Sequence, residues 1–348
     1  MKNSIIPNRS SLVASLLIAL AFILHLSFDR AFSGAAKQTR FQFTQVHMGT
    51  EFKIILYAAG PEVATRAANA AFDRIGELDS IMSDYKPDSE LMRLCQTEAG
   101  PPVHVSTDLF RVLSHAQDLA VRSDGAFDVT VGPVVRLWRE ARARQRLPDP
   151  VHLAEALKLV GYESLRLDPQ FTTVQLLKPG MRLDLGGIAK GDAADQAIVV
   201  LKAFGISSAL VAGAGDIAAS APPPGSEGWV IAVEPLDSKQ NNPSRSFFLH
   251  DGAVSTSGDA EQHLEVGGVR YSHIVNPKTG MGLTGHSSVT VVAHDGITAD
   301  SLATAVSVLG PERGLKLVES YEGAGVLFVL ETEKGERSYE LRFPKERK

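Results

Sequence analysis

The residues best suited to chemistry in this sequence lie in a glycine-rich segment, residues 184–191, which begins with Asp184 and contains Lys190. We expect a strand to end here and a helix to begin, with Gly186 and Gly187 letting a ligand approach the backbone closely. Free amides at the start of a helix and the ammonium group of Lys190 both favour an anion such as a phosphate. The glycine spacing fits neither a Walker A loop nor a dinucleotide-binding fingerprint. A strand–helix turn with a surface lysine and no ligand would explain the same residues.

A carboxylate and a hydroxyl, Asp300 and Thr304, lie four residues apart in a predicted helix over 299–309. Side chains at this spacing share one helix face. Together they suit a hard cation such as Mg²⁺, which takes its other ligands from carbonyls, water or phosphate. The alternative is structural, with an acid in the first turn beside a Thr298 cap and Thr304 bonded back to a carbonyl.

Three other segments carry weaker signals. His273 precedes a proline-containing turn and fits either a general base or a structural histidine. Residues 255–257 offer hydroxyls that suit phosphate donors or the polar end of a strand. Residues 125–130 combine a glycine with Phe127 and Asp128, which fit a ligand site or a buried aromatic beside a capping acid.

The elements that must position these residues are a mixture of helices and strands. Apolar residues recur every three or four positions over 61–82 and after a cap at residue 106 or 107, which predicts two helices. The segment 41–57 alternates as a strand interrupted at residues 48–50. No regular strand–helix–strand rhythm follows, which favours an α+β fold over a doubly wound sheet. The basic stretch 136–146 is interpreted as a solvated helix face.

Composition bounds the class of protein. The chain has 348 residues, 44% of them hydrophobic and 22% charged, which is typical of a folded globular protein. Its net charge of −5 argues against nucleic acid as the main partner. A single cysteine, Cys95, excludes an internal disulfide and a thiolate-cluster metal site.

The N-terminal segment, residues 1–36, has the pattern of a secretory signal peptide. Lys2 and Arg9 precede an apolar run over 12–26, and small residues follow at 31–36. The run of about 15 residues is shorter than the roughly 20 that a spanning helix needs. An uncleaved N-terminal membrane anchor is the alternative. Either way we expect an exported protein, in the periplasm or on the outer face of the inner membrane.

Taken together, these segments resemble the FAD:protein FMN transferase family, also called the ApbE family. No single segment is specific for this family, but the order and spacing of the segments along almost the whole chain are specific for it. The matching segments are 48–50, 83–91, 125–133, 184–191, 214–216, 255–258, 271–280 and 299–304.

The resemblance implies an α+β domain over residues 41–345, with mixed, largely antiparallel sheets, packed helices and FAD in a cleft between two lobes. It also implies Mg²⁺-dependent transfer of the FMN half of FAD to a Thr or Ser hydroxyl of an acceptor protein, with release of AMP. The expected FAD contacts are Met48, Tyr85, Ala126, Phe127, Asp128, Asp184, Lys190 and Ile274. The expected metal ligands are the Gly187 carbonyl, Asp300 and Thr304, and His273 is the expected base.

Two departures from the family pattern concern the phosphate side of the site. Asp192 stands where the family commonly has Tyr, and Ala212 and Ala214 replace an Asn and a Gly. Two other functions remain as alternatives: hydrolysis of FAD to FMN and AMP with water as acceptor, and FAD binding without catalysis. The pair of Asp300 and Thr304, together with His273, favours catalysis because binding alone requires neither a metal nor a base.

Overall fold

The computed structural model describes residues 38–236, 245–258 and 263–347. Its contacts divide the chain into Met1–Thr39 and a compact unit, Arg40–Lys348. The predicted signal or anchor, residues 1–36, lies outside the described residues. Within the described ranges, no helix combines the length and the hydropathy needed to cross a membrane.

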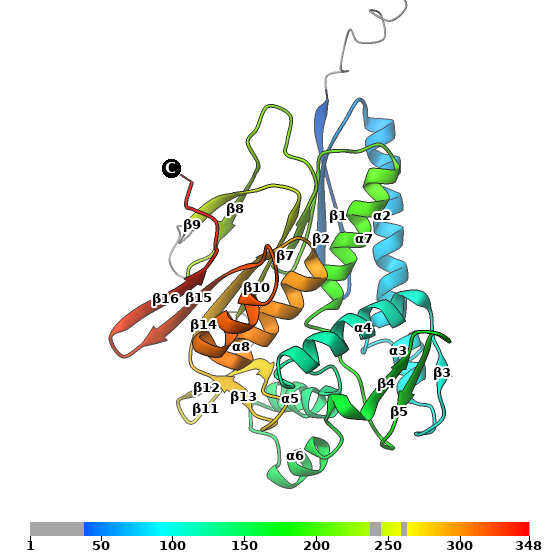
Figure 1. Ribbon diagram of the computed structural model, residues 1–348, viewed down its shortest axis with the longest axis vertical. Helices are drawn as coiled ribbons and strands as arrows, with labels where there is room; N and C mark the ends of the chain where they lie inside the picture. The colour runs from blue at the N-terminus through cyan, green and yellow to red at the C-terminus, as the bar shows by residue number, and fades with distance from the viewer. Residues whose placement is uncertain (1–37, 237–244, 259–262, 348) are drawn as a thin grey trace, which may run out of the picture. The chain divides into compact units, whose positions relative to one another are not determined.

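An eight-stranded sheet forms the centre of the compact unit, in the order β1-β2-β6-β7-β10-β14-β15-β16 (Figure 1). Every neighbouring pair from β2 to β16 is antiparallel, which confirms the predicted α+β class. The strands are β1 (Thr39–His47), β2 (Thr50–Ala58), β6 (Ala209–Gly213), β7 (Asp216–Ala219), β10 (Gly252–Gly258), β14 (Ser287–Ala293), β15 (Gly325–Thr332) and β16 (Gly335–Leu341).

Both faces of this sheet are covered. The long helices α2 (Pro61–Met82), α7 (Ala189–Ala203) and α8 (Gly296–Glu319) pack on one face, where they form the main core with every second residue of the strands (Figure 1). The hairpin of β8 (Trp229–Val233) and β9 (Arg245–Leu249) packs on the other face. Alternation along β15 shows the division, since Phe328 joins the main core while Leu327 faces the hairpin.

Smaller elements surround the ends of the central sheet. Trp138 of α5 (Gly132–Arg144) is buried against β11 (His263–Val266) and β12 (Val269–Val275), and its indole N–H donates to the Gly280 carbonyl at 2.7 Å. In the third sheet, β12 lies between β11 and β13 (Gly282–Thr284). A fourth sheet has the order β3 (Val103–His104), β5 (Thr173–Leu176), β4 (Leu165–Asp168). The remaining small elements are the helices α3 (Glu90–Cys95), α4 (Thr107–Arg122) and α6 (Pro150–Leu157) and a short 3₁₀ turn (Tyr162–Ser164).

Several local expectations can be compared with these elements. The helix predicted over 61–82 is α2, and the break predicted at 48–50 is the turn between β1 and β2. The helix predicted over 299–309 is the first part of α8, which begins earlier, at Gly296, and is broken at Gly310, where φ is 73°. The strand expected before residue 184 is wrong, because the chain there forms only an isolated bridge between Arg182 and Val131.

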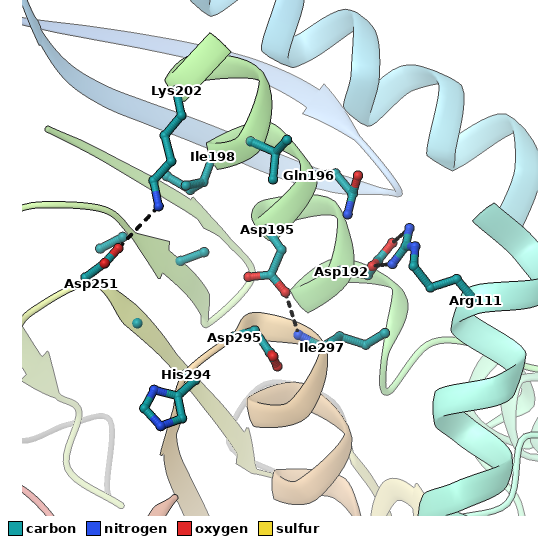
Figure 2. Close-up of a pocket in the computed structure, with 14 residues that line it drawn as sticks. Arg111, Asp192, Asp195, Gln196, Ile198, Lys202, Asp251, His294, Asp295 and Ile297 are labelled. Carbon is teal, nitrogen blue, oxygen red and sulfur yellow. Dashed lines mark hydrogen bonds and ion pairs between the residues drawn. The ribbon is translucent and has the colours of Figure 1, made fainter. Parts of the chain in front are cut away.

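A very close contact joins the first turns of α7 and α8. A methyl group on Gly191 would overlap the Gly296 carbonyl and lie 2.8 Å from the Cβ of Asp300. Asp195 of α7 strengthens this contact, because its carboxylate accepts the Gly296 amide at 2.7 Å and the Ile297 amide at 3.0 Å. Figure 2 shows the bond between Asp195 and Ile297. The start of α8 is therefore fixed against α7, which brings Lys190 and Asp300 together.

We predict that Gly191→Ala destabilises the fold by about 1–3 kcal/mol, the usual effect of overpacking a close contact. Thermal unfolding measures this, with Gly60→Ala as the matched control, because a Cβ at Gly60 meets nothing within 4 Å. Equal melting temperatures for Gly191→Ala and the wild-type protein would show that α7 and α8 are not held this closely.

Candidate active site

One cavity of about 1130 Å³ is lined by all twelve residues that the sequence analysis assigned to FAD, the metal or the base. They come from distant parts of the chain: the β1–β2 turn, the loops after α2 and α4, the start of α7, β12 and α8. Residues of the central sheet, of α7 and α8, and of α5 and β12 all line the cavity. The predicted cleft is thus a cavity within one compact unit.

One end of the cavity contains charged groups held between α7, α8 and β7. Lys190 Nζ lies 3.2 Å from Asp216 Oδ2 and 3.8 Å from Asp300 Oδ2, and it donates to the Gly186 carbonyl at 2.9 Å. Asp300 is 3% exposed and accepts the Gly191 amide at 3.1 Å. We call Lys190, Asp216 and Asp300 the charged cluster.

The pKa values of this cluster reflect its burial. Burial raises the pKa of Asp300 to about 7, and the charge of Asp216 adds to the effect while Lys190 opposes it. For Lys190, burial disfavours the charged form, but Asp216 and Asp300 outweigh it and raise the pKa above its usual value. Lys190 is therefore a cation at neutral pH.

The charged cluster also fits the expected Mg²⁺. A Cβ on Gly187 would lie 2.7 Å from Thr304 Oγ1, so only a glycine lets the backbone of this expected ligand lie directly against the Thr304 hydroxyl. Within the described ranges, the buried Asp216 Oδ2 has the ion pair with Lys190 but no well-aligned hydrogen bond. Among the described residues no three His, Cys, Asp or Glu side chains could hold a metal together. An ion here would therefore complete its coordination with water and phosphate oxygens, as Mg²⁺ usually does.

Asp216 and Ser255 are site residues that the sequence analysis did not assign. Ser255 Oγ donates to Asp216 Oδ1 at 2.5 Å, from the neighbouring strand β10. Both side chains line the cavity. The hydroxyls at 255–257 were noted, but only the pairing of β7 with β10 shows that one of them supports the carboxylate beside Lys190.

The other end of the cavity is built around Tyr85, which is 74% exposed. The guanidinium group of Arg139 lies 4.3 Å above the centre of its ring. Arg139 also pairs with Asp84 and, at 2.8 Å, with Asp184 Oδ2. The interpretation of 136–146 as a solvated helix face is thus wrong for Arg139 and Arg142. Trp138 anchors α5, and both arginines line the cavity.

Residues of two further segments, the loop after α4 and the turn between β1 and β2, also line the cavity. Phe127 is 5% exposed, and Asp128 Oδ1 accepts the amide and hydroxyl of Thr130 at 2.8 and 2.6 Å. These contacts agree with the structural interpretation of the segment, and both residues also line the cavity, as a ligand site would require. Met48 has a φ of 50° in the tight turn between β1 and β2, a strained backbone position for a residue other than glycine.

The expected base lies on β12, the central strand of its sheet. His273 is partly buried and lines the cavity beside Ile274, which is 9% exposed. The Ile274 amide donates to Ser272 Oγ at 3.1 Å, which fixes the backbone next to the histidine. His273 can thus meet a group that enters the cavity.

The residues that depart from the family pattern, Asp192, Ala212 and Ala214, differ in whether they line the cavity. Asp192 lies outside this cavity, on another side of α7, where it pairs with Arg111 (Figure 2). Ala214 lines the cavity in the turn between β6 and β7 and has a φ of 48°. Ala212 is packed on the hairpin side of the sheet. Only Ala214 can therefore affect the phosphate side directly.

Comparison with known proteins agrees with this arrangement. The ApbE family model matches residues 48–328. The chain is 34% identical over 338 residues to the FAD:protein FMN transferase of Vibrio cholerae, covering 93% of this chain and 96% of that protein. It is 33% identical over 312 residues to the FAD:protein FMN transferase of Treponema pallidum, covering 85% and 86%.

Solved structures of flavin transferases and other ApbE proteins are also similar to this chain. The flavin transferase ApbE from Vibrio cholerae superposes with a TM-score of 0.79 at 32% identity, over 88% of this chain and 98% of that one. The ApbE protein of Thermotoga maritima has a TM-score of 0.78 at 31% identity, over 87% and 97%. With its fold, its cavity and its sequence in agreement, the chain belongs to the ApbE family.

Proposed function

We propose that this protein is a FAD:protein FMN transferase, which moves the FMN half of FAD to a Thr or Ser hydroxyl of an acceptor protein and releases AMP. The observation that carries the proposal is the cavity in which the charged cluster, the exposed Tyr85 and His273 all meet. A dinucleotide with two flat rings and a central pyrophosphate has the same division into apolar and charged parts. The relatives that bear this activity in their names support it.

The reaction asks this chain mainly for positioning and charge. Lys190 would bind the pyrophosphate at the start of α7, and Gly187, Asp300 and Thr304 would hold Mg²⁺ beside it. Bound Mg²⁺ would neutralise phosphate charge as the bond breaks. His273 would accept the proton of the acceptor hydroxyl while the oxygen of that hydroxyl forms the new bond to the FMN phosphorus. The bond between that phosphorus and the oxygen of AMP breaks, and AMP leaves.

The test of this function is AMP release from FAD and Mg²⁺, with and without an acceptor protein carrying an exposed Thr or Ser. We expect AMP to form only with the acceptor, and the acceptor to gain bound flavin. AMP in equal amounts without acceptor would identify an FAD hydrolase instead, and no AMP under either condition would identify a binding protein.

The metal assignment predicts that Asp300→Asn abolishes AMP release and weakens Mg²⁺ binding in calorimetry, because the buried ligand loses its charge. Asp118→Asn is the control, since it removes an exposed carboxylate on α4. The fold should survive both changes, which circular dichroism checks. Full activity of Asp300→Asn at limiting Mg²⁺ contradicts the assignment.

The base assignment predicts a different pattern for His273→Ala. Transfer should fall by roughly 10²–10⁴-fold, the usual contribution of a general base, while FAD binds as tightly as before. Flavin fluorescence measures the affinity and AMP release the rate. If FAD affinity falls in parallel with the rate, His273 is a binding or structural residue.

We also propose that the protein acts outside the cytoplasm, in the periplasm or at the outer face of the inner membrane. The proposal rests on the signal-like pattern of residues 1–36. Fractionation of cells that produce the full chain tests it. Recovery of all the protein in the cytoplasm would contradict it, and the mass of the exported form would separate a cleaved signal from an anchor.

A further inference from the structure

Arg142 of α5 is a cavity residue whose charge is not compensated by a neighbouring side chain. It is partly buried and lines the cavity, yet its guanidinium group has no hydrogen bond or ion pair within the part of the chain that the structure describes. Placing a cation away from water without a partner costs free energy. Burial and the charge of Arg139 both lower the pKa of Arg142, in keeping with this cost. A ligand that accepts hydrogen bonds would offset it.

The neighbouring arginine is fully engaged. Arg139, three residues earlier on α5, pairs with Asp84 and Asp184 and covers one face of the Tyr85 ring at 4.3 Å. The ring is nevertheless 74% exposed, which leaves its other face open. Arg139 thus holds Tyr85 in place as a platform before any ligand binds, which lowers the entropy lost on stacking.

Arg142 and Tyr85 belong to the same end of the cavity. Arg142 lies one turn after Arg139 on α5, Arg139 lies 4.3 Å from the centre of the Tyr85 ring, and both Arg142 and Tyr85 line the cavity. The charged cluster of Lys190, Asp216 and Asp300 forms a separate group, joined by its own ion pairs. A flat ring on Tyr85 would therefore bring its edge toward Arg142, while the pyrophosphate lies at the charged cluster.

We infer that Arg142 is a substrate-recognition residue that donates hydrogen bonds to the acceptor-rich edge of the FAD ring stacked on Tyr85, with Arg139 as the residue that positions the platform. The inference rests on the proposed use of FAD. Both rings of FAD have the required chemistry, since the flavin presents carbonyl oxygens and adenine presents ring nitrogens. Arginine suits either, because its planar group carries only donors.

The test measures the two halves of the substrate separately, with FMN binding followed by fluorescence and AMP binding by calorimetry. We expect Arg142→Met to lower the affinity for one of the two, FMN or AMP, by roughly 10- to 100-fold, the effect of losing a hydrogen bond to a charged group. The affinity for the other should stay unchanged. Tyr85→Ala should lower the affinity for the same half of FAD. The half affected shows whether flavin or adenine occupies this end.

Arg144→Met is the matched control, because Arg144 lies on the same helix, is 61% exposed and does not line the cavity. It should leave both affinities unchanged. The inference is overturned if Arg142→Met leaves the affinities for FMN and AMP both unchanged, lowers both equally, or lowers only the affinity for inorganic pyrophosphate. Failure of the wild-type protein to bind FAD, FMN or AMP would overturn the proposed function, whereas wild-type binding with an unaffected Arg142→Met overturns this inference alone.

Discussion

The close contact of α7 and α8 at Gly191 and Gly296 is the constraint on which the charged end of the site depends. Only residues without a side chain allow the two helices to approach this closely. Lys190 precedes one of these glycines and Asp300 lies one turn beyond the other, so their side chains meet within 3.8 Å. Asp195 and the cap Asp295 satisfy amides in the first turn of α8, which keeps that turn in place.

The two ends of the cavity are stabilised in different ways. At the charged end, buried groups of opposite sign compensate one another, and Ser255 satisfies one oxygen of Asp216. At the other end, Tyr85 remains exposed and depends on Arg139 for its orientation. Asp184 connects the two ends, because one of its oxygens binds Arg139 and the other accepts the Gly186 amide at 2.8 Å. A protein with a net charge of −5 can thus offer a dinucleotide both a buried lysine and an aromatic ring.

Much of this arrangement could be predicted from local sequence. The apolar period of 61–82 indicates α2, and the four-residue spacing of Asp300 and Thr304 places both on one face of α8. Contacts between distant segments could not be predicted in this way. Arg139 has the same local context as the exposed arginines around it, and only the packing of Trp138 under Gly280 shows which way it points. The strand expected before residue 184 failed because an apolar run does not reveal whether a neighbouring strand exists to pair with it.

The proposed chemistry requires the pyrophosphate of FAD and a divalent ion to meet at the charged cluster, beside Gly187 and Thr304. Pulsed electron paramagnetic resonance tests this requirement, with Mn²⁺ in place of Mg²⁺ and FAD bound. We predict a magnetic coupling between Mn²⁺ and phosphorus in the wild-type protein, and its loss in Asp300→Asn. Absence of that coupling in the wild-type protein with both ligands bound, or its persistence in Asp300→Asn, would show that the ion and the pyrophosphate do not meet there.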